Sequence, residues 1–244
     1  AESARVPLFG QEKTRGFGEE GDRETQIGLA DTVEIGDLVF ENYPVNFAGK
    51  DTVLAEDGII GTEVFSRFLI TLDFNKNRLL LDRLPDPPGV GETDSYSVYD
   101  FDWEPGPERK DYHSFRFIHG KVLVPSLVNG EEEVHLIFDT GASYNIFSHS
   151  LADKVEYTRL ENRTLTGVSG RIDDIRKVDE VRIGLAGIEQ VSHLTMAFDL
   201  DGISRILGTE IGGLIGYPFL LRCVISIDYR TGSIRIIPDP HRRD

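Results

Sequence analysis

An apolar run that ends in an acid, a hydroxyl and a glycine constrains this chain more than any other stretch. Residues 136–143 read Leu-Ile-Phe-Asp-Thr-Gly-Ala-Ser. The alternation over 134–138 has the two-residue period of a β-strand, and Gly141 permits a sharp turn. We expect Asp139 at a strand end, partly shielded from water, where a carboxylate needs hydrogen bonds. Such sites tend to be functional, although Asp-Thr-Gly is also a good turn sequence.

Composition indicates a soluble, β-leaning globular protein. The 244 residues are 39% hydrophobic and include 25 glycines and 11 prolines. The formal charge of −16 argues against nucleic acid or an anionic membrane as a partner. No apolar run approaches the length of a membrane span. We interpret the acidity as a contribution to solubility.

Other chemistries find no support in the sequence. The chain has neither a Gly-x-Ser-x-Gly elbow nor a nucleotide-binding glycine loop, so we expect no cofactor. The histidines show no metal-ligand spacing; they are His113, His119, His135, His149, His193 and His241. The single cysteine, Cys223, lies in an apolar run typical of a core. It leaves the compartment open, with the periplasm or export preferred over the cytoplasm. The start at Ala1 fits either a mature end left by signal cleavage or a boundary, and the sequence does not separate these.

The order of patterns along the chain predicts mainly strands. Residues 1–24 are polar and predict an irregular start with a turn at 15–18. The expected elements that follow are a hairpin over 32–40 continued by 43–47, a loop over 49–57, a short helical segment over 62–68, and strands over 69–74 and 78–81. Prolines and acids over 85–112 predict a linker. Strands over 115–118, 121–127 and 133–138 then lead into Asp139.

The second half of the sequence repeats the first. Three segments recur in the same order: 33–36 as 181–184, 58–61 as 213–216, and 70–75 as 225–230. The offset drifts only from 148 to 155 residues. Three matches in order imply two copies of one β unit.

The acid motif and the repeat together resemble the retropepsin-like aspartic peptidases, including two-lobed bacterial aspartyl proteases. Asp-Thr-Gly-Ala-Ser at 139–143 and Gly-Leu-Ile-Gly-Tyr-Pro-Phe-Leu at 213–220 carry the resemblance. It implies an all-β protein of two tandem β-barrel lobes. Residues 1–84 would form an incomplete first lobe, 85–112 the linker, and 113–240 a complete second lobe.

The resemblance also implies roles for individual residues. Asp139 would be the catalytic carboxylate, Thr140 would brace it by hydrogen bonding across the lobe interface, and Gly141 would permit the turn. Ala142 occupies a position where retroviral-type enzymes carry alanine, and would lie in the substrate cleft. No metal is implied, and the substrate would be a peptide or a protein.

A glycine-flanked segment 28 residues after Asp139 matches the position of the family's flap, the hairpin that closes over substrate. Its residues are Gly167, Val168, Ser169 and Gly170. Glycine there would let backbone amides reach a bound peptide. An ordinary hairpin tip explains the segment equally well.

The chain departs from the family in one respect, because it contains a single Asp-Thr-Gly. Family chemistry uses two aspartates that share a proton. By the repeat offset, the first counterpart would fall roughly ten residues before Ala1, so we expect the second acid from an upstream segment of the same precursor or from a homodimer. Asp73 and Asp228 match each other and are expected to face turns. The alternative is an inactive peptide-binding or structural pseudopeptidase.

Overall fold

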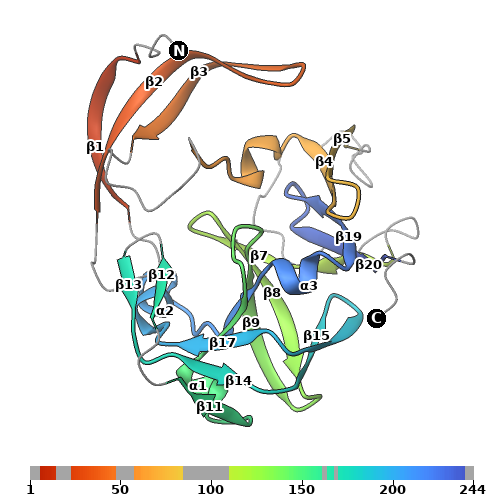
Figure 1. The fold of residues 1–244 in the computed structure, drawn as a ribbon. Helices are drawn as coiled ribbons and strands as arrows, with labels where there is room; N and C mark the ends of the chain where they lie inside the picture. The colour runs from red at the N-terminus through yellow and green to blue at the C-terminus, as the bar shows by residue number, and fades with distance from the viewer. Residues whose placement is uncertain are drawn as a thin grey trace. The chain divides into compact units, whose positions relative to one another are not determined.

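The computed structural model consists mainly of β-strands (Figure 1). It describes residues 6–14, 23–47, 58–84, 110–160, 164–167 and 170–239. The chain divides into two compact units, Ala1–Ile59 with Asn162–Asp174, and Ile60–Glu161 with Ile175–Asp244. The predicted all-β class is confirmed. The expected turn at 15–18, the loop at 49–57, the linker up to residue 109, and His241 lie outside the described residues.

The first unit contains a three-stranded antiparallel sheet with the order β1-β2-β3. Its strands are β1 (Leu8–Thr14), β2 (Arg23–Ile35) and β3 (Leu38–Phe47). Ile35 pairs with Leu38 across a two-residue turn at Gly36 and Asp37. Gly36 has a φ of +58°, which glycine adopts without strain. The predicted hairpin is therefore confirmed.

The predicted irregular start is wrong over Leu8–Thr14, because this segment forms β1 and pairs with β2. The hydroxyl of Thr25 donates to the carbonyl oxygen of Glu12 at 3.2 Å. Leu8 and Phe9 are 51% and 66% exposed, so no buried face imposes a period on the sequence. Backbone pairing with a later segment makes the strand, and sequence periodicity does not report such pairing.

The second unit contains a curled ten-stranded sheet, whose β8–β9 hairpin is green in Figure 1. The strand order is β11-β14-β17-β10-β18-β9-β8-β15-β16, with β7 also paired to β8. The strands are β7 (Arg116–Ile118), β8 (Lys121–Val128), β9 (Glu132–Phe138), β10 (Asn145–Ser148), β11 (Tyr157–Arg159), β14 (Arg176–Val178), β15 (Val181–Leu185), β16 (Ile188–Ser192), β17 (Thr195–Phe198) and β18 (Gly213–Ile215).

A second sheet in the same unit joins strands from both halves of the sequence, with the order β5-β4-β19-β20-β6. Its strands are β4 (Phe68–Asp73), β5 (Arg78–Arg83), β6 (His113–Ser114), β19 (Cys223–Asp228) and β20 (Ser233–Pro238), and the 3₁₀ helix η1 (Thr62–Phe65) precedes β4. The carboxylate of Asp73 accepts from the backbone N–H of Lys76 at 3.1 Å. The carboxylate of Asp228 accepts from the N–H of Arg230 at 2.9 Å. Both aspartates therefore close hairpin turns, as expected.

The core of the second unit is apolar and comes from both sheets. Side chains that are fully buried include Ile70, Leu123, Leu136, Phe147, Ile183, Leu214 and Ile225. Cys223 is 0% exposed, so its predicted place in the core is confirmed. Removal of this apolar surface from water is the main favourable term for folding. The predicted duplication stays a prediction.

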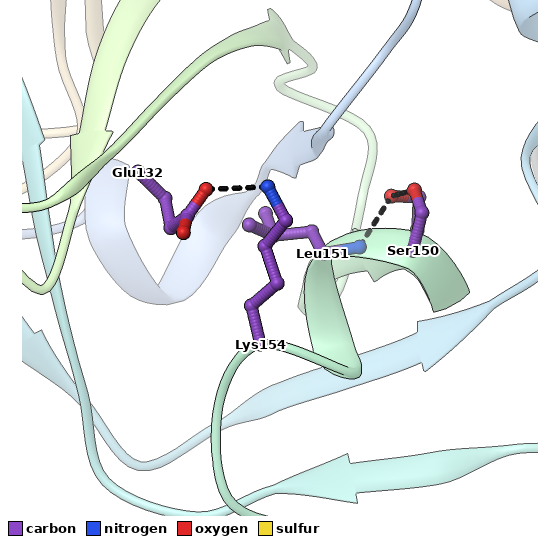
Figure 2. Close-up of polar contacts among 5 residues, drawn as sticks. Glu132, Ser150, Leu151 and Lys154 are labelled. Carbon is purple, nitrogen blue, oxygen red and sulfur yellow. Dashed lines mark hydrogen bonds and ion pairs between the residues drawn. The ribbon is translucent and has the colours of Figure 1, made fainter.

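The three α-helices in the described part of the chain are short. Helix α1 (His149–Ala152) begins at Ser148, whose hydroxyl accepts from the N–H of Leu151 at 3.2 Å. Figure 2 shows Lys154, which follows this helix, reaching Glu132 of β9 at 2.5 Å. The other helices are α2 (Asp201–Leu207) and α3 (Tyr217–Leu220). Within the described ranges, every helix is too short or too polar to cross a membrane.

Candidate active site

Asp139 follows directly on β9, whose last three residues are buried. Leu136, Ile137 and Phe138 are 0%, 2% and 8% exposed. Side chains on both faces of the strand end are therefore buried. The expected alternation between buried and exposed side chains does not extend to these last three residues of β9. Asp139 is half-buried, whereas Thr140 is exposed. The strand thus delivers a partly shielded carboxylate to a turn, as predicted.

Strand β18 lies between β9 and β10 and holds the turn that connects them. It pairs in parallel with β9 and in antiparallel fashion with β10. Beyond these pairs, the N–H of Asp139 donates to the carbonyl of Ile215 at 3.0 Å. The N–H of Tyr217 donates to the carbonyl of Ala142 at 2.8 Å. Residues 215–217 therefore contact the turn at two points.

Two glycines allow β18 and the residue after it to approach the turn this closely. A Cβ added at Gly216 would meet the carbonyl oxygens of Ala142 and Tyr144. A Cβ added at Gly213 would meet the carbonyl oxygen of Ile146. Because these obstacles are backbone atoms, a rotamer change could not remove the clash. The Gly-Leu-Ile-Gly pattern is thus a packing requirement of the site.

The carboxylate of Asp139 is oriented by its own turn. Its Oδ1 accepts from the N–H of Gly141 at 2.9 Å, and its backbone carbonyl accepts from the N–H of Ala142 at 3.3 Å. In the described part of the chain, Gly141 is the one hydrogen-bond partner of the Asp139 carboxylate, so the other carboxylate oxygen, Oδ2, has no protein donor there. The described residues also hold no group of three His, Cys, Asp or Glu side chains suited to a metal. The arrangement suits a carboxylate that acts on water.

Asp139 lines neither of two cavities that lie among the described residues of this unit. One of about 380 Å³ lies beside the turn, against Ser143, Asn145 and Tyr217. Another of about 710 Å³ includes His135 in its wall. Burial and the nearby positive charge of Arg116 lower the pKa of His135, which favours its neutral imidazole.

A family model described as aspartyl protease matches residues 124–219, a segment that contains both the Asp139 turn and β18. That segment is similar to aspartyl proteases. Among solved structures, the chain is similar to the retroviral protease-like domain of Ddi1 from Leishmania major. That match has 15% identity and a TM-score of 0.28, and it covers 50% of this chain and 98% of the other. No curated protein matches the chain.

The expected flap falls on a hairpin of β12 (Leu165–Gly167) and β13 (Gly170–Ile172). Gly167 pairs with Gly170, whereas Val168 and Ser169 lie outside the described residues. The hairpin belongs to the compact unit that also holds β1, β2 and β3. A hairpin is confirmed at the predicted position, and its role as a flap stays a prediction.

Sequence reasoning missed the residues that contact the Asp139 turn from its buried side. Asn145 is 0% exposed, and its side chain contacts Gly216 and Ser192. Ser192 in turn contacts Thr195. One signal was available, because an asparagine opens the apolar run Asn-Ile-Phe at 145–147. A buried amide requires hydrogen-bond partners, although the sequence does not say which.

Proposed function

We propose that this protein is an aspartic endopeptidase in which Asp139 activates the water that attacks the peptide bond. The observation that carries the proposal is the state of the Asp139 carboxylate. One of its oxygens is held by Gly141, and the other has no protein donor among the described residues. An acid oriented at the end of a buried strand is pre-positioned to take a proton from water.

Peptide hydrolysis of this kind requires a second acid. One carboxylate acts as the base toward water while a protonated partner polarises the scissile carbonyl, and the two titrate as a coupled pair. Asp73 and Asp228 do not fill this role, because backbone N–H groups of their own turns occupy them. The 244 residues contain one Asp-Thr-Gly. The second acid is therefore supplied by another polypeptide segment or by a second copy of the chain.

The proposed substrate is a peptide or protein bound in extended form. Ala142 lies on the Asp139 turn, where a bound peptide would pass. Gly167, Val168, Ser169 and Gly170 form the proposed flap, and their backbone amides would hydrogen-bond to the peptide. The chemistry uses carboxylates and water, so the proposal includes no cofactor, and the acidic charge disfavours nucleic acid as a partner.

The single motif favours one other function, that of a catalytically inactive pseudopeptidase which binds peptides. The two proposals differ in what a second acid would change. An endopeptidase gains activity when the chain is paired with a partner that brings an aspartate. A pseudopeptidase binds peptide without cleaving it under any such condition.

Cleavage of a denatured protein at acidic to neutral pH tests the endopeptidase proposal, with Asp139→Asn as the inactive reference. Mass spectrometry of the products distinguishes internal cleavage from trimming of ends. Binding of the same substrate, measured in parallel by fluorescence anisotropy, separates an inactive peptide binder from a chain that does not recognise peptides. Cleavage that persists in Asp139→Asn would place the chemistry elsewhere.

A further inference from the structure

A buried amide lies behind the Asp139 turn, and the mechanism above does not use it. Asn145 is the first residue of β10, six positions after Asp139, and it is 0% exposed. Its backbone N–H donates to the carbonyl of Leu194 at 3.3 Å. A buried carboxamide must satisfy both its oxygen and its nitrogen, so its partners show what it holds together.

The partners of Asn145 can be assigned from chemistry alone. The backbone N–H of Gly216 can only donate, so its partner at 3.0 Å is the amide oxygen Oδ1. The amide nitrogen Nδ2 then faces the hydroxyl of Ser192, also at 3.0 Å. That hydroxyl lies 2.9 Å from the hydroxyl of Thr195, which is 0% exposed. A continuous buried chain therefore runs from Gly216 through Asn145 to Ser192 and Thr195.

Gly216 is the middle of the three residues that hold the turn. Ile215 on one side accepts from the N–H of Asp139, and Tyr217 on the other donates to the carbonyl of Ala142. Asn145 holds the residue between them. Movement of Gly216 would displace both contacts with the turn at once.

We propose that Asn145 is a positioning residue, which fixes residues 215–217 and through them the orientation of the Asp139 carboxylate. The role in catalysis rests on the peptidase function proposed above, whereas the effect on the turn does not. Asn145 touches no reacting atom, and it acts through Gly216. The network that anchors it, Ser192 and Thr195, belongs to β16 and β17.

Asn145→Leu removes both side-chain hydrogen bonds and leaves a side chain of similar size. We expect the amide hydrogens of Asp139, Gly216 and Tyr217 to exchange at least about tenfold faster in this variant. Exchange along β20 should be unchanged. Gln190→Leu is the matched control, because the Gln190 amide donates to the carbonyl of Phe219 at 3.4 Å and to the sulfur of Cys223 at 3.1 Å, and neither hydrogen bond involves residues 215–217. Unchanged exchange at the turn, or a uniform rise over the whole unit, would overturn the proposal.

Asn145→Asp provides a second test that does not depend on the leucine variant folding. A protonated carboxyl group can supply one acceptor and one donor, which are the two roles that the Asn145 amide fills here, whereas an ionised one loses the donor and buries a charge. Turn amides should therefore exchange as in the wild type at low pH and faster as the pH rises, relative to the wild type at the same pH. An effect of Asn145→Asp that is the same at every pH would contradict the assignment.

Kinetic measurements complete the test, and they use the assembly of this chain that cleaves peptide. Asn145→Leu should lower kcat about 100-fold while KM changes less than about threefold, since a displaced carboxylate mainly affects the chemical step. An equal loss in the Gln190→Leu control would mean a general structural effect and would defeat the proposal. If no assembly cleaves peptide, the peptidase function fails, and the exchange experiments still decide whether Asn145 holds the turn.

Discussion

Thr71 and Ser226 face each other across the antiparallel pair β4–β19, with their hydroxyl oxygens 3.3 Å apart. They are separated by 155 residues, which equals the offset of two of the three repeated segments. Ile70 pairs with Ile227, and Leu72 pairs with Ile225, so the register is symmetric about this contact. Two related hairpins meeting about a local two-fold axis would produce this register. Duplication of the unit remains a prediction.

The pairing of β4 with β19 makes Ile70 part of the core of the second unit. Ile70 is 0% exposed, and Ile70→Ala should lower the free energy of unfolding by about 2–5 kcal/mol because it leaves a cavity. Leu80→Ala on the neighbouring strand is the control. Leu80 is 39% exposed, so its truncation should cost less than about 1 kcal/mol. Urea unfolding measures both, and equal losses would contradict the packing.

The same pairing makes a prediction about where the second unit begins. A chain starting at Ile60 keeps β4 and β5, whereas one starting at His113 exposes the unpaired edge of β19. We expect the longer chain to unfold cooperatively as a monomer, and the shorter one to be less stable and to aggregate. Size-exclusion chromatography and urea unfolding compare them. Equal stability would support the predicted boundary at 113 instead.

Asp139→Asn should lower peptidase activity by at least about 10³-fold without loss of the fold. The change removes the charge but keeps an oxygen that can accept from Gly141. The free energy of unfolding should be unchanged or slightly higher, since the amide avoids placing a charge in a half-buried site. Circular dichroism and urea unfolding check the fold. Loss of activity together with loss of structure would leave the role of Asp139 unsupported.

The need for a second acid predicts that residues 1–244 as a monomer do not cleave peptides. In a homodimer, two copies of Asp139 would form the pair, and the rate would rise with the square of protein concentration well below the dissociation constant. A mixture of wild type and Asp139→Asn would then lose activity beyond simple dilution. Full activity that is independent of concentration in a monomer would contradict the two-acid requirement.

Cys223 should make the free energy of unfolding depend on pH in the alkaline range. Burial raises the pKa of the Cys223 thiol to about 11, from 9.0. Between these values the unfolded thiol ionises while the folded one keeps its proton, so stability falls as pH rises, by up to about 1.4 kcal/mol per pH unit. Burial also raises the pKa of Tyr229, so the comparison must be with Cys223→Ala. The free energy of unfolding of the variant should decline less steeply between pH 9 and 11 than that of the wild type. Identical slopes would refute the assignment of this pH dependence to Cys223.

Local sequence signals predicted much of the fold because their causes lie within a few residues. Gly36 and the apolar runs around it specified a hairpin, and β9 ends at Phe138, directly before Asp139, as its pattern indicated. Asp73 and Asp228 were correctly expected to face turns, since each accepts from N–H groups two or three residues further along. Within the site, the Asp-Thr-Gly turn was identifiable from sequence for the same reason.

The sequence by itself determined the strand-rich class, the turns and the acid at the strand end. Tertiary structure alone decided that β1 is a strand, that β18 lies between β9 and β10, and that Asn145 holds Gly216 across 71 residues of sequence. The physical reason is that these features depend on hydrogen bonds between distant segments. A residue's own pattern shows that a buried polar group needs a partner, and only the folded chain determines which partner it meets.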